Sequence, residues 1–258
     1  MLLVYNIGND EIRLGFADGD TLVGTASVST DAARTIDEYA VILKGLLSFR
    51  GLDAGSFDGA ICSSVVPTVT ETVRSAVELL LGFRPHVLGV GTKTGLRILT
   101  DDPTQLGADL VASAVGALKK YTPPLILVDF TTATTFSALD ADGAFLGCAI
   151  APGVGLAAQA LSSGTSLLPH FATTPPKKCI GTNTMESMQS GCLFGTAAMT
   201  CGMIDRIERE LGMTATVIAS GRDAECIIPI CERDIVCDDT LLLYGLAEIY
   251  KRNMRKRK

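Results

Sequence analysis

The chain carries one pattern of short segments twice, and this repetition is the feature that most constrains its fold. Each copy has an apolar strand, a polar turn, an alternating strand, a turn containing Asp and Gly, and a return strand. The first copy covers residues 2–27, with a turn at Asp18-Gly19-Asp20, and the second covers residues 125–150, with a turn at residues 140–143. Alternation with a period of two is typical of strands. The recurrence of the pattern without identity of sequence predicts two α/β halves related by a distant duplication.

Helical periodicity follows both copies. Thr35 and Glu38 are spaced as a capping box at the start of the first expected helix. The break at residues 121–124, Tyr-Thr-Pro-Pro, predicts a boundary between domains of residues 1–120 and 121–258. Two such halves suit a nucleotide held in a cleft between them. The expected helices cover about residues 36–46, 69–81, 104–120, 154–161, 184–211 and 240–252, and further strands are expected near residues 59–65, 86–88, 216–219 and 235–237.

Composition excludes several classes of protein. Of the 258 residues, 47% are hydrophobic and only 19% are charged, which argues against disorder. The net charge of −6 creates no global field that would favour nucleic acid or an anionic membrane. The basic segment KRNMRKRK at residues 251–258 has two interpretations, a nucleic-acid or lipid anchor and a solvated helix end, and the second is favoured.

Cysteine usage and the apolar segments indicate a cytoplasmic protein. None of the eight cysteines forms a Cys-x-x-Cys pair, and neither histidine has zinc-finger spacing, so we expect reduced and mostly buried thiols. The start of the chain lacks the cationic region of a secretion signal. Residues 144–161 carry no charge, but their glycines and Pro152 predict a strand, a turn and a buried helix start rather than a membrane helix.

Seven short motifs occur in a fixed order along the whole chain. They are NIGN at residues 6–9, SSVVP at 63–67, KTGL at 93–96, GAD at 107–109, DF-x-TATTF at 129–136, G-x-AIAPG at 147–153 and IG-x-NT-x-E-x-MQSG at 180–191. Their joint order and spacing make chance similarity very unlikely. On these motifs the sequence resembles the type III pantothenate kinases, which are members of the actin, sugar kinase and heat-shock ATPase superfamily.

The resemblance implies a fold, a reaction and partners. The fold would be two ribonuclease H-like, actin-like ATPase domains with a nucleotide cleft between them. The reaction would transfer the γ-phosphoryl group of ATP to the hydroxyl of pantothenate, which is the first step towards coenzyme A. Magnesium, a monovalent cation such as potassium or ammonium, and a homodimer are implied as well. Neither nucleic acid nor a membrane is expected as a partner.

The resemblance also implies a role for individual residues. Asp109 would orient and deprotonate the attacking hydroxyl as the general base of an in-line transfer, and Asp129 would hold the monovalent cation. Without the resemblance, Asp109 is read as an N-terminal helix carboxylate, Asp129 as a strand-end turn carboxylate and Thr184 as a helix N-cap. The residues expected to contact ATP are Asn6, Ile7, Gly8, Asn9, Asp10 and Thr132. The residues expected to contact the substrate are Thr100, Gly107, Ala108, Asp109, Leu110 and Thr184. Of these, Thr184 would reach the substrate from across the dimer interface.

Several positions that face the ligands depart from the family pattern. Asn6 replaces an aspartate that is expected to help hold magnesium, and we hypothesise that Asp10, where threonine is usual, supplies the missing charge. Leu110 replaces an arginine that would pair with the carboxylate of pantothenate. The remaining departures are Thr100 for tyrosine, Thr131 for a glycine of the second phosphate turn, and Arg222 for a glycine near the nucleotide.

Three explanations of these departures stay open. The first is a kinase of an alcohol that lacks the carboxylate, such as pantetheine. The second is a paralogue that has lost catalysis and keeps a binding or regulatory role. The third is a pantothenate kinase that tolerates the variation. A nucleic-acid role of the basic tail is a distant alternative to all three.

Overall fold

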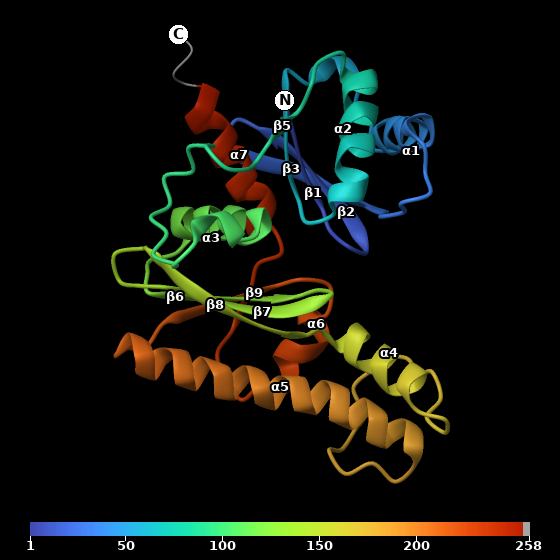
Figure 1. The fold of residues 1–258 in the computed structure, drawn as a ribbon, viewed down its shortest axis with the longest axis vertical. Coiled ribbons are helices and arrows are strands. Elements are labelled where there is room, and N and C mark those ends of the chain that lie inside the picture. Colours follow the sequence, from blue (N-terminus) through green and yellow to red (C-terminus); the bar gives the residue numbers. More distant parts are fainter. Residues whose placement is uncertain (255–258) are drawn as a thin grey trace. The chain divides into compact units, whose positions relative to one another are not determined.

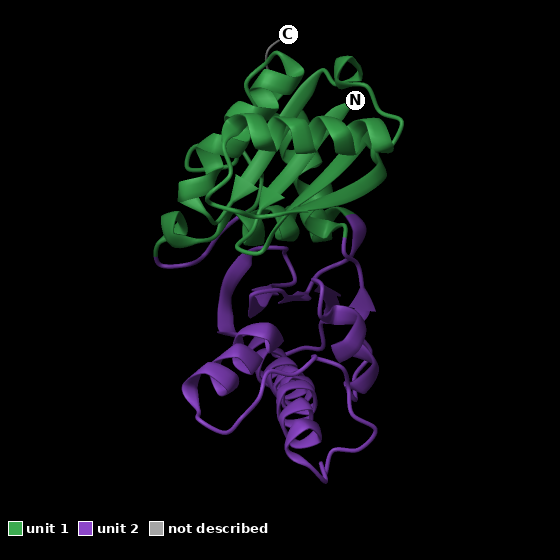
Figure 2. Cartoon of the chain, turned by 90° about the vertical axis from the view of Figure 1, so that its right-hand side faces the viewer, with its two compact units in different colours: residues 1–96, 102–119, 240–258 green, residues 97–101, 120–239 purple. Residues whose placement is uncertain are grey.

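The computed structural model describes residues 1–254, which form two compact units (Figure 2). The first unit contains residues 1–96, 102–119 and, after a long interruption, residues 240–254. The second unit contains residues 97–101 and 120–239. The segment after residue 240 thus packs with the first unit, whereas the sequence places it in the range 121–258.

The sheet of the first unit has the strand order β3-β2-β1-β4-β5 (Figure 1). Central strand β1 is buried along its whole length, runs antiparallel to β2 and runs parallel to β4. The successive antiparallel strands β1, β2 and β3 are the arrangement that the repeated pattern of strands and turns predicts. The strands are β1 (Leu2–Ile7), β2 (Glu11–Asp18), β3 (Thr21–Ser29), β4 (Gly59–Ser64) and β5 (His86–Val87).

Helices cover both faces of this sheet. Helices α1 (Ile36–Phe49) and α2 (Pro67–Leu81) bury their apolar residues in the same core as alternate β1 residues such as Tyr5. Helix α7 (Leu241–Met254) packs on the opposite face, where Leu243 reaches Gly15 of β2. Helix α3 (Ala108–Lys120) crosses α7 so closely that a side chain at Gly116 or Gly245 would strike the other helix's backbone.

The ends of two expected helices can be compared with the structure. The capping box at α1 is confirmed, because Thr35 accepts from the backbone N–H of Glu38 and the Glu38 carboxylate accepts from that of Thr35. The helix expected from residue 104 begins only at residue 108, because residues 103–105 form a separate 3-10 turn that Asp102 caps. A further short 3-10 turn covers residues 54–56.

The sheet of the second unit repeats the first, with the order β10-β9-β6-β7-β8. Here β6 runs antiparallel to β7 and parallel to β9, as β1 does to β2 and β4. The duplication inferred from the sequence is therefore present in the topology, and the predicted mixed α/β class is confirmed. The strands are β6 (Leu125–Phe130), β7 (Ala133–Leu139), β8 (Phe145–Pro152), β9 (Thr216–Ser220) and β10 (Val236–Cys237).

The helices of the second unit are α4 (Val154–Gly164), α5 (Thr184–Leu211) and α6 (Ala224–Ile227), followed by a 3-10 turn at Ile228–Ile230. Helix α5 contributes Leu193 and Ile204 to the core that β6 and β9 form. Its N-cap is Asn183, whose side chain accepts from the N–H of Glu186, so the interpretation of Thr184 as the cap is wrong. In a capping box the Glu lies three residues after the cap. Glu186 lies only two residues after Thr184 but three residues after Asn183, so the spacing in the sequence already favours Asn183 as the cap.

Cysteine burial differs from the expectation. No disulfide occurs within residues 1–254, but only Cys62 and Cys192 are buried, while Cys148, Cys179 and Cys237 are exposed. The expectation of mostly buried thiols is therefore wrong. Cys148 lies on the edge strand β8, Cys179 in a loop and Cys237 on the short strand β10. A side chain at such a position is buried only if another helix, strand or loop packs over it, and the sequence pattern does not show whether one does.

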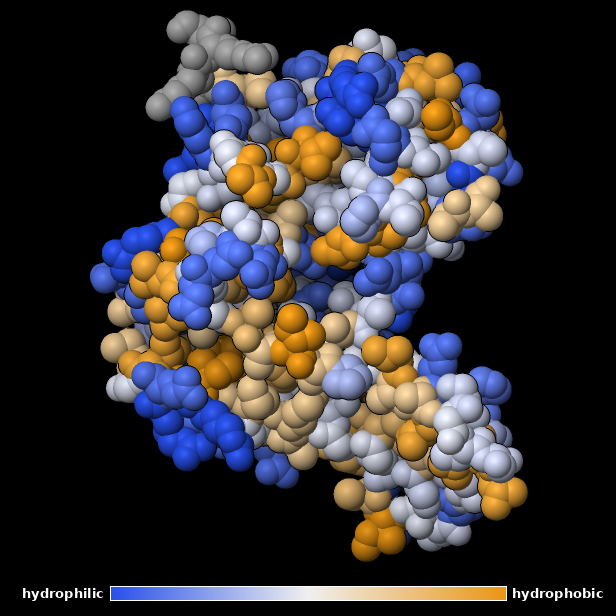
Figure 3. Space-filling view, in the orientation of Figure 1, coloured by the Kyte–Doolittle hydropathy of each residue, from blue (hydrophilic) through white to orange (hydrophobic). Residues whose placement is uncertain are grey.

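The surface and the apolar segments complete the fold. Apolar side chains lie among hydrophilic ones on the face drawn in Figure 3. The exposed large apolar side chains of the described residues include Phe49 and Leu167. Residues 144–161 form β8, a turn at Gly153 and the start of α4, as expected. No helix within residues 1–254 combines the length and the apolarity needed to cross a membrane. Half of the basic tail, residues 255–258, lies outside the described residues.

Candidate active site

The turn between β1 and β2 is the first predicted phosphate-binding element. The N–H of Gly8 donates to the carbonyl of Glu11 at 3.0 Å, which closes the turn. Thr30 braces it, because its hydroxyl donates to the Gly8 carbonyl at 2.7 Å and its N–H donates to the Asp10 carbonyl at 3.0 Å. Asn9 and Asp10 are exposed at the tip of the turn, where their side chains are accessible to a ligand.

Asn6 is buried beneath this turn. It is the last but one residue of β1 and pairs with Ser63 of β4, whose hydroxyl donates to Asn6 Oδ1 at 2.8 Å. Ser63 is itself fully buried. Asn6 thus has the shape of an aspartate without its charge, and its amide oxygen accepts a hydrogen bond inside the protein.

Asp109 lies in the first turn of α3. Its Oδ1 accepts the N–H of Leu110 at 2.9 Å, yet burial raises the pKa of this carboxyl above its usual value, and the backbone N–H bonds only partly offset the effect. A side chain at Gly107 would come within 2.4 Å of Asp109 Oδ1, so glycine is required there for the carboxylate to take this position. Among residues 1–254, no Lys, Arg or His forms an ion pair with Asp109. A carboxylate that is desolvated and not neutralised is suited to accept a proton.

The turn between β6 and β7 is the second predicted phosphate-binding element. Asp129 is the last but one residue of β6, and its carboxylate accepts from the Ser220 hydroxyl at 2.9 Å and from the Thr131 hydroxyl at 2.8 Å. Ser220 ends β9, the parallel neighbour of β6, just as Ser63 lies on the parallel neighbour of β1. Both strand ends therefore combine an acidic or amide side chain with a serine of the adjacent strand.

Two glycines bring backbones close together around this second turn. The N–H of Gly153 donates to the Thr132 carbonyl at 3.0 Å, and a side chain at Gly153 would lie 2.2 Å from the Thr131 oxygen. Gly221 has φ +99° and packs against the backbone of Phe130. A Cβ added to Gly155 would lie 3.6 Å from a guanidinium nitrogen of Arg222. The Arg222 guanidinium is therefore close to the first turn of α4.

The structure brings some of the predicted residues together. In the first unit Asn6, Gly8, Asn9 and Asp10 share the β1–β2 turn, while Gly107, Ala108, Asp109 and Leu110 share the start of α3. In the second unit Asp129, Thr131 and Thr132 share the β6–β7 turn. Thr100 belongs to this unit as well, and its buried hydroxyl has no hydrogen-bond partner within residues 1–254. Thr184 is exposed at the first residue of α5. Convergence of all these groups on one phosphate pocket stays a prediction.

The sequence alone suggests no role for Ser63 or Ser220. Each serine lies at or next to the carboxyl end of a strand that runs parallel to β1 or β6, and parallel strands end at the same edge of a sheet. The register that puts each serine beside its partner is a long-range property. Among residues 1–254, no group of three or more His, Cys, Asp or Glu side chains is placed to hold a metal ion.

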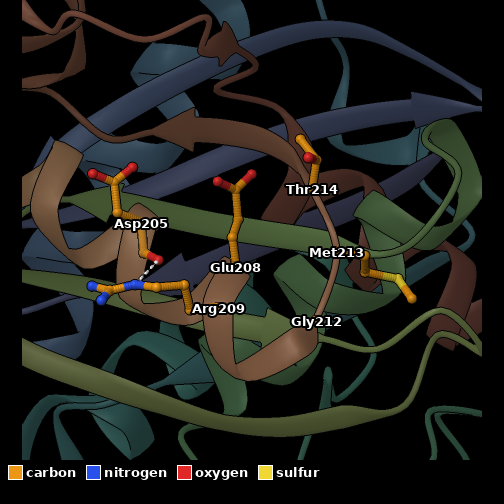
Figure 4. Close-up of a pocket in the computed structure, with 6 residues that line it drawn as sticks. All are labelled: Asp205, Glu208, Arg209, Gly212, Met213 and Thr214. Carbon is orange, nitrogen blue, oxygen red and sulfur yellow. Dashed lines mark hydrogen bonds between the residues drawn. The ribbon is translucent and has the colours of Figure 1, made fainter.

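One surface pocket lies elsewhere. It has a volume of about 740 Å³ and is lined at the C-terminal end of α5 by Asp205, Glu208, Arg209, Gly212, Met213 and Thr214 (Figure 4). Arg209 donates to the backbone carbonyl of Asp205 in its own helix. None of the predicted site residues lines this pocket, so it gives no support to the expected chemistry.

Comparison with known proteins identifies the family. The model of the family described as type III pantothenate kinase matches residues 2–206. A type III pantothenate kinase from Pelobacter propionicus is 41% identical over 253 residues, which is 98% of this chain and 100% of that protein. A type III pantothenate kinase from Moorella thermoacetica is 39% identical over 253 residues, with 98% of this chain and 100% of that protein covered.

A solved structure supports the fold independently. The activator of the 2-hydroxyisocaproyl-CoA dehydratase from Clostridium difficile, solved with bound ADPNP, aligns with a TM-score of 0.53 over 100% of this chain and 98% of that chain, at 11% sequence identity. The two related five-stranded sheets thus define a protein of the actin-like α/β fold class. Within that class, the chain belongs to the type III pantothenate kinase family.

Proposed function

We propose that the chain transfers the γ-phosphoryl group of ATP to the hydroxyl of pantothenate, with Asp109 as the general base. The observation that carries this proposal is the half-buried Asp109 carboxylate, whose pKa is raised by burial and which forms no ion pair within residues 1–254. A base of this kind accepts the proton of the attacking hydroxyl as the phosphoryl group is transferred. Gly107 supports the role, because it leaves room for the carboxylate.

The two strand-end turns are proposed to bind the phosphates of ATP. Small residues and exposed backbone in the turn of Gly8, Asn9 and Asp10 allow close approach of an anion. In the second turn Thr132 supplies a hydroxyl, and the tight packing of Gly153 fixes the backbone that carries it. These contacts require both turns to face one cleft, as the resemblance to the family implies.

Magnesium fits the first turn through Asp10. Magnesium in nucleotide sites is bound by one or two carboxylates and takes its other ligands from phosphate and water. Asn6 has one amide oxygen engaged by Ser63, so Asp10 is the residue proposed to hold the ion. When bound, the metal would neutralise charge on the phosphates.

Leu110, in the part of the site proposed to bind the substrate, favours a second candidate substrate as well. Leu110 follows Asp109 directly and offers no charge to a carboxylate. A charged hydrogen bond lost at this position would weaken pantothenate binding roughly tenfold to a hundredfold. This observation favours a related alcohol without the carboxylate, such as pantetheine, as an alternative substrate of the same reaction.

The assembly and the location follow the family. We propose a cytoplasmic homodimer in which Thr184 of one subunit contacts the substrate held by Asp109 of the other. Thr184 is exposed at the start of α5, and its side chain is not needed to cap the helix, because Asn183 does so. It is therefore available for a contact with a partner subunit.

A coupled kinase assay tests the proposal. Purified protein with ATP, magnesium and potassium should release ADP when pantothenate or pantetheine is added. The ratio of kcat/KM between these two alcohols tells which one Leu110 accommodates. Absence of turnover on either alcohol, combined with tight ATP binding by calorimetry, would contradict the kinase and favour a binding or regulatory role.

A further inference from the structure

Two thiols from different elements meet on one face of helix α5. Cys201 lies in the second half of α5, and Cys231 directly follows the 3-10 turn at Ile228–Ile230, which contacts α5. The two side chains are half-buried and hydrogen-bonded to each other. Sulfurs in such contact need only small side-chain rotations to reach the distance of a covalent bond. The sequence spacing of these cysteines gives no sign of this, because the fold brings them together.

A cluster of ion pairs beside the thiols holds Cys231 in its place. Arg233 donates to Asp205 Oδ1 at 2.7 Å and to Glu208 Oε2 at 2.5 Å. Asp205 and Glu208 lie four and seven residues after Cys201, so the three side chains share one face of the helix. Figure 4 shows both carboxylates on the same side of α5. Two residues of chain span at most about 7 Å, so the anchored Arg233 keeps Cys231 close to that face.

Packing and a backbone hydrogen bond fix the same segment. Ile230, Cys231 and Ile235 pack against the apolar core to which α5 contributes. The N–H of Cys231 donates to the Ile228 carbonyl at 3.0 Å. Burial, and after it the neighbouring Cys201 sulfur, raise the pKa of the Cys231 thiol well above its usual value, so this thiol keeps its proton at neutral pH. The reduced pair is therefore the resting state.

From this geometry we propose that Cys201 and Cys231 are a redox-modification site, at which a peroxide forms a reversible disulfide between α5 and the segment that follows the 3-10 turn. First, one sulfur attacks the peroxide, the O–O bond breaks, and a sulfenic acid forms with release of one water. The other sulfur then attacks the sulfenic sulfur, the S–S bond forms, and the hydroxyl group leaves as a second water. The two thiols together lose two protons and two electrons, and hydrogen peroxide is reduced to two waters.

In a reducing compartment such a bond persists only while peroxide is present, and exchange with other thiols reverses it. The bond would tie the segment of residues 221–231, which begins where β9 ends, to helix α5. It can be measured without kinase turnover, so a failed kinase assay leaves it unaffected.

The test treats purified full-length protein with a small excess of hydrogen peroxide and then blocks the remaining thiols with N-ethylmaleimide in denaturant. Trypsin places Cys201 in the peptide of residues 179–206 and Cys231 in the peptide of residues 223–233. Mass spectrometry should find these two peptides joined, with a mass two hydrogen atoms below their sum, and dithiothreitol should separate them. Non-reducing electrophoresis should show the mass of a single chain, because the bond lies within one subunit.

Serine variants identify the two sulfurs, because each peptide contains further cysteines. Cys201→Ser and Cys231→Ser should each abolish the joined peptides. Cys179→Ser and Cys226→Ser are the matched controls, one in each peptide, and both should keep the joined peptides. Joined peptides that persist in Cys201→Ser, or a parent that yields none, would overturn the proposal. If Cys201→Ser does not fold, Cys231→Ser decides the question alone.

Thermal melts show whether the folded protein accommodates the bond. A disulfide that closes a loop of about thirty residues should raise the melting temperature of the oxidised parent by roughly 5 °C or more above that of the reduced parent. Peroxide should cause no such rise in Cys201→Ser or Cys231→Ser. An oxidised parent that melts below the reduced one would contradict a bond formed within the native geometry.

Discussion

At the scale of single residues, short polar side chains decide how charge is distributed over the candidate site. The neutral amide of Asn6 accepts a hydrogen bond from Ser63, while the carboxylate of Asp129 accepts hydrogen bonds from Ser220 and Thr131. The same strand-end geometry thus has a neutral side chain in one half of the duplication and an anionic one in the other. The two halves share the backbone pattern, and the chemical roles that we propose for them differ through these side chains.

Replacing Asp109 tests both its chemistry and its burial. Asp109→Asn should lower kcat by about a hundredfold or more, because a general base is lost. Burial raises the folded-state pKa of Asp109, so its ionised form destabilises the fold at pH values above that pKa. Asp109→Asn should therefore melt at a higher temperature than the parent at neutral pH, and the gain should vanish as the pH falls below about 3.9, where both states are protonated. Thermal melts across pH check this.

The activity of the parent should follow the same ionisation. Activity should rise with pH as the Asp109 carboxyl loses its proton, at a pH above the usual aspartate range. Exposed Asp234→Asn is the matched control and should change neither the rate nor the melting temperature. A melting temperature of Asp109→Asn that stays below the parent's at every pH would contradict the argument from burial.

Asp10 is predicted to replace the charge that Asn6 lacks. Asp10→Ala should abolish magnesium-dependent ATP binding, with a loss of about a hundredfold or more, because a unit charge in contact with the ion is removed. Calorimetry with ATP in magnesium and in EDTA measures the effect. Asp18→Ala, an exposed aspartate at the end of β2, serves as the control. Unchanged magnesium–ATP affinity in Asp10→Ala would end the compensation hypothesis.

At the scale of elements, the sequence predicts most of the fold. Periodicity is a local property, so α5 has the bounds 184–211 that its pattern predicts, and its left-handed C-cap is Gly212. Short elements carry too few residues for a period, which is why α6 and the 3-10 turns were not expected. Motifs identified Asp109 and Asp129, whereas Ser63 and Ser220 depend on strand register, which links residues 57 and 91 positions apart.

The crossing of α3 and α7 predicts the effect of one added methyl group. The Cβ of an alanine at residue 245 would lie 1.8 Å from the Ala112 carbonyl oxygen, so Gly245→Ala must push the two helices apart. We expect a loss of roughly 1–3 kcal/mol in the free energy of unfolding and a lower kcat, because α3 carries Asp109. Urea denaturation together with the kinase assay measures both.

Helix α1 offers the matched control. Gly45 lies in the interior of α1 with open space around it. Gly45→Ala should raise the free energy of unfolding by about 1 kcal/mol, because alanine loses less conformational freedom in a helix. If both variants shift stability in the same direction, the helix crossing is looser than the structure describes.

At the scale of the whole molecule, the chain is two copies of one topology with different tasks. The first unit holds Asp109 and the β1–β2 turn, and the second holds Asp129 and the β6–β7 turn. The proposed dimer adds a third contributor, because Thr184 would act on a substrate bound by another subunit. The catalytic unit would then be the dimer.

Mixing two inactive variants tests this arrangement. Asp109→Asn and Thr184→Val should each have little activity alone. If each site uses Asp109 of one subunit and Thr184 of the other, heterodimers formed in an equal mixture contain one intact site, and roughly a quarter of the parent activity returns. Sedimentation checks that mixed dimers form. Heterodimers that stay inactive would place both residues in sites built from one subunit.

The packing of α7 on β1 and β4 bears on how the protein is made. During synthesis, residues 240–254 leave the ribosome only after the entire second unit, yet they cover a face of the first unit's central strands. Tyr250 even occupies the space beside Gly59 that any larger residue would need. One apolar face of the first unit's sheet therefore stays uncovered until α7 has been made, although its strands β1 to β5 are synthesised before those of the second unit.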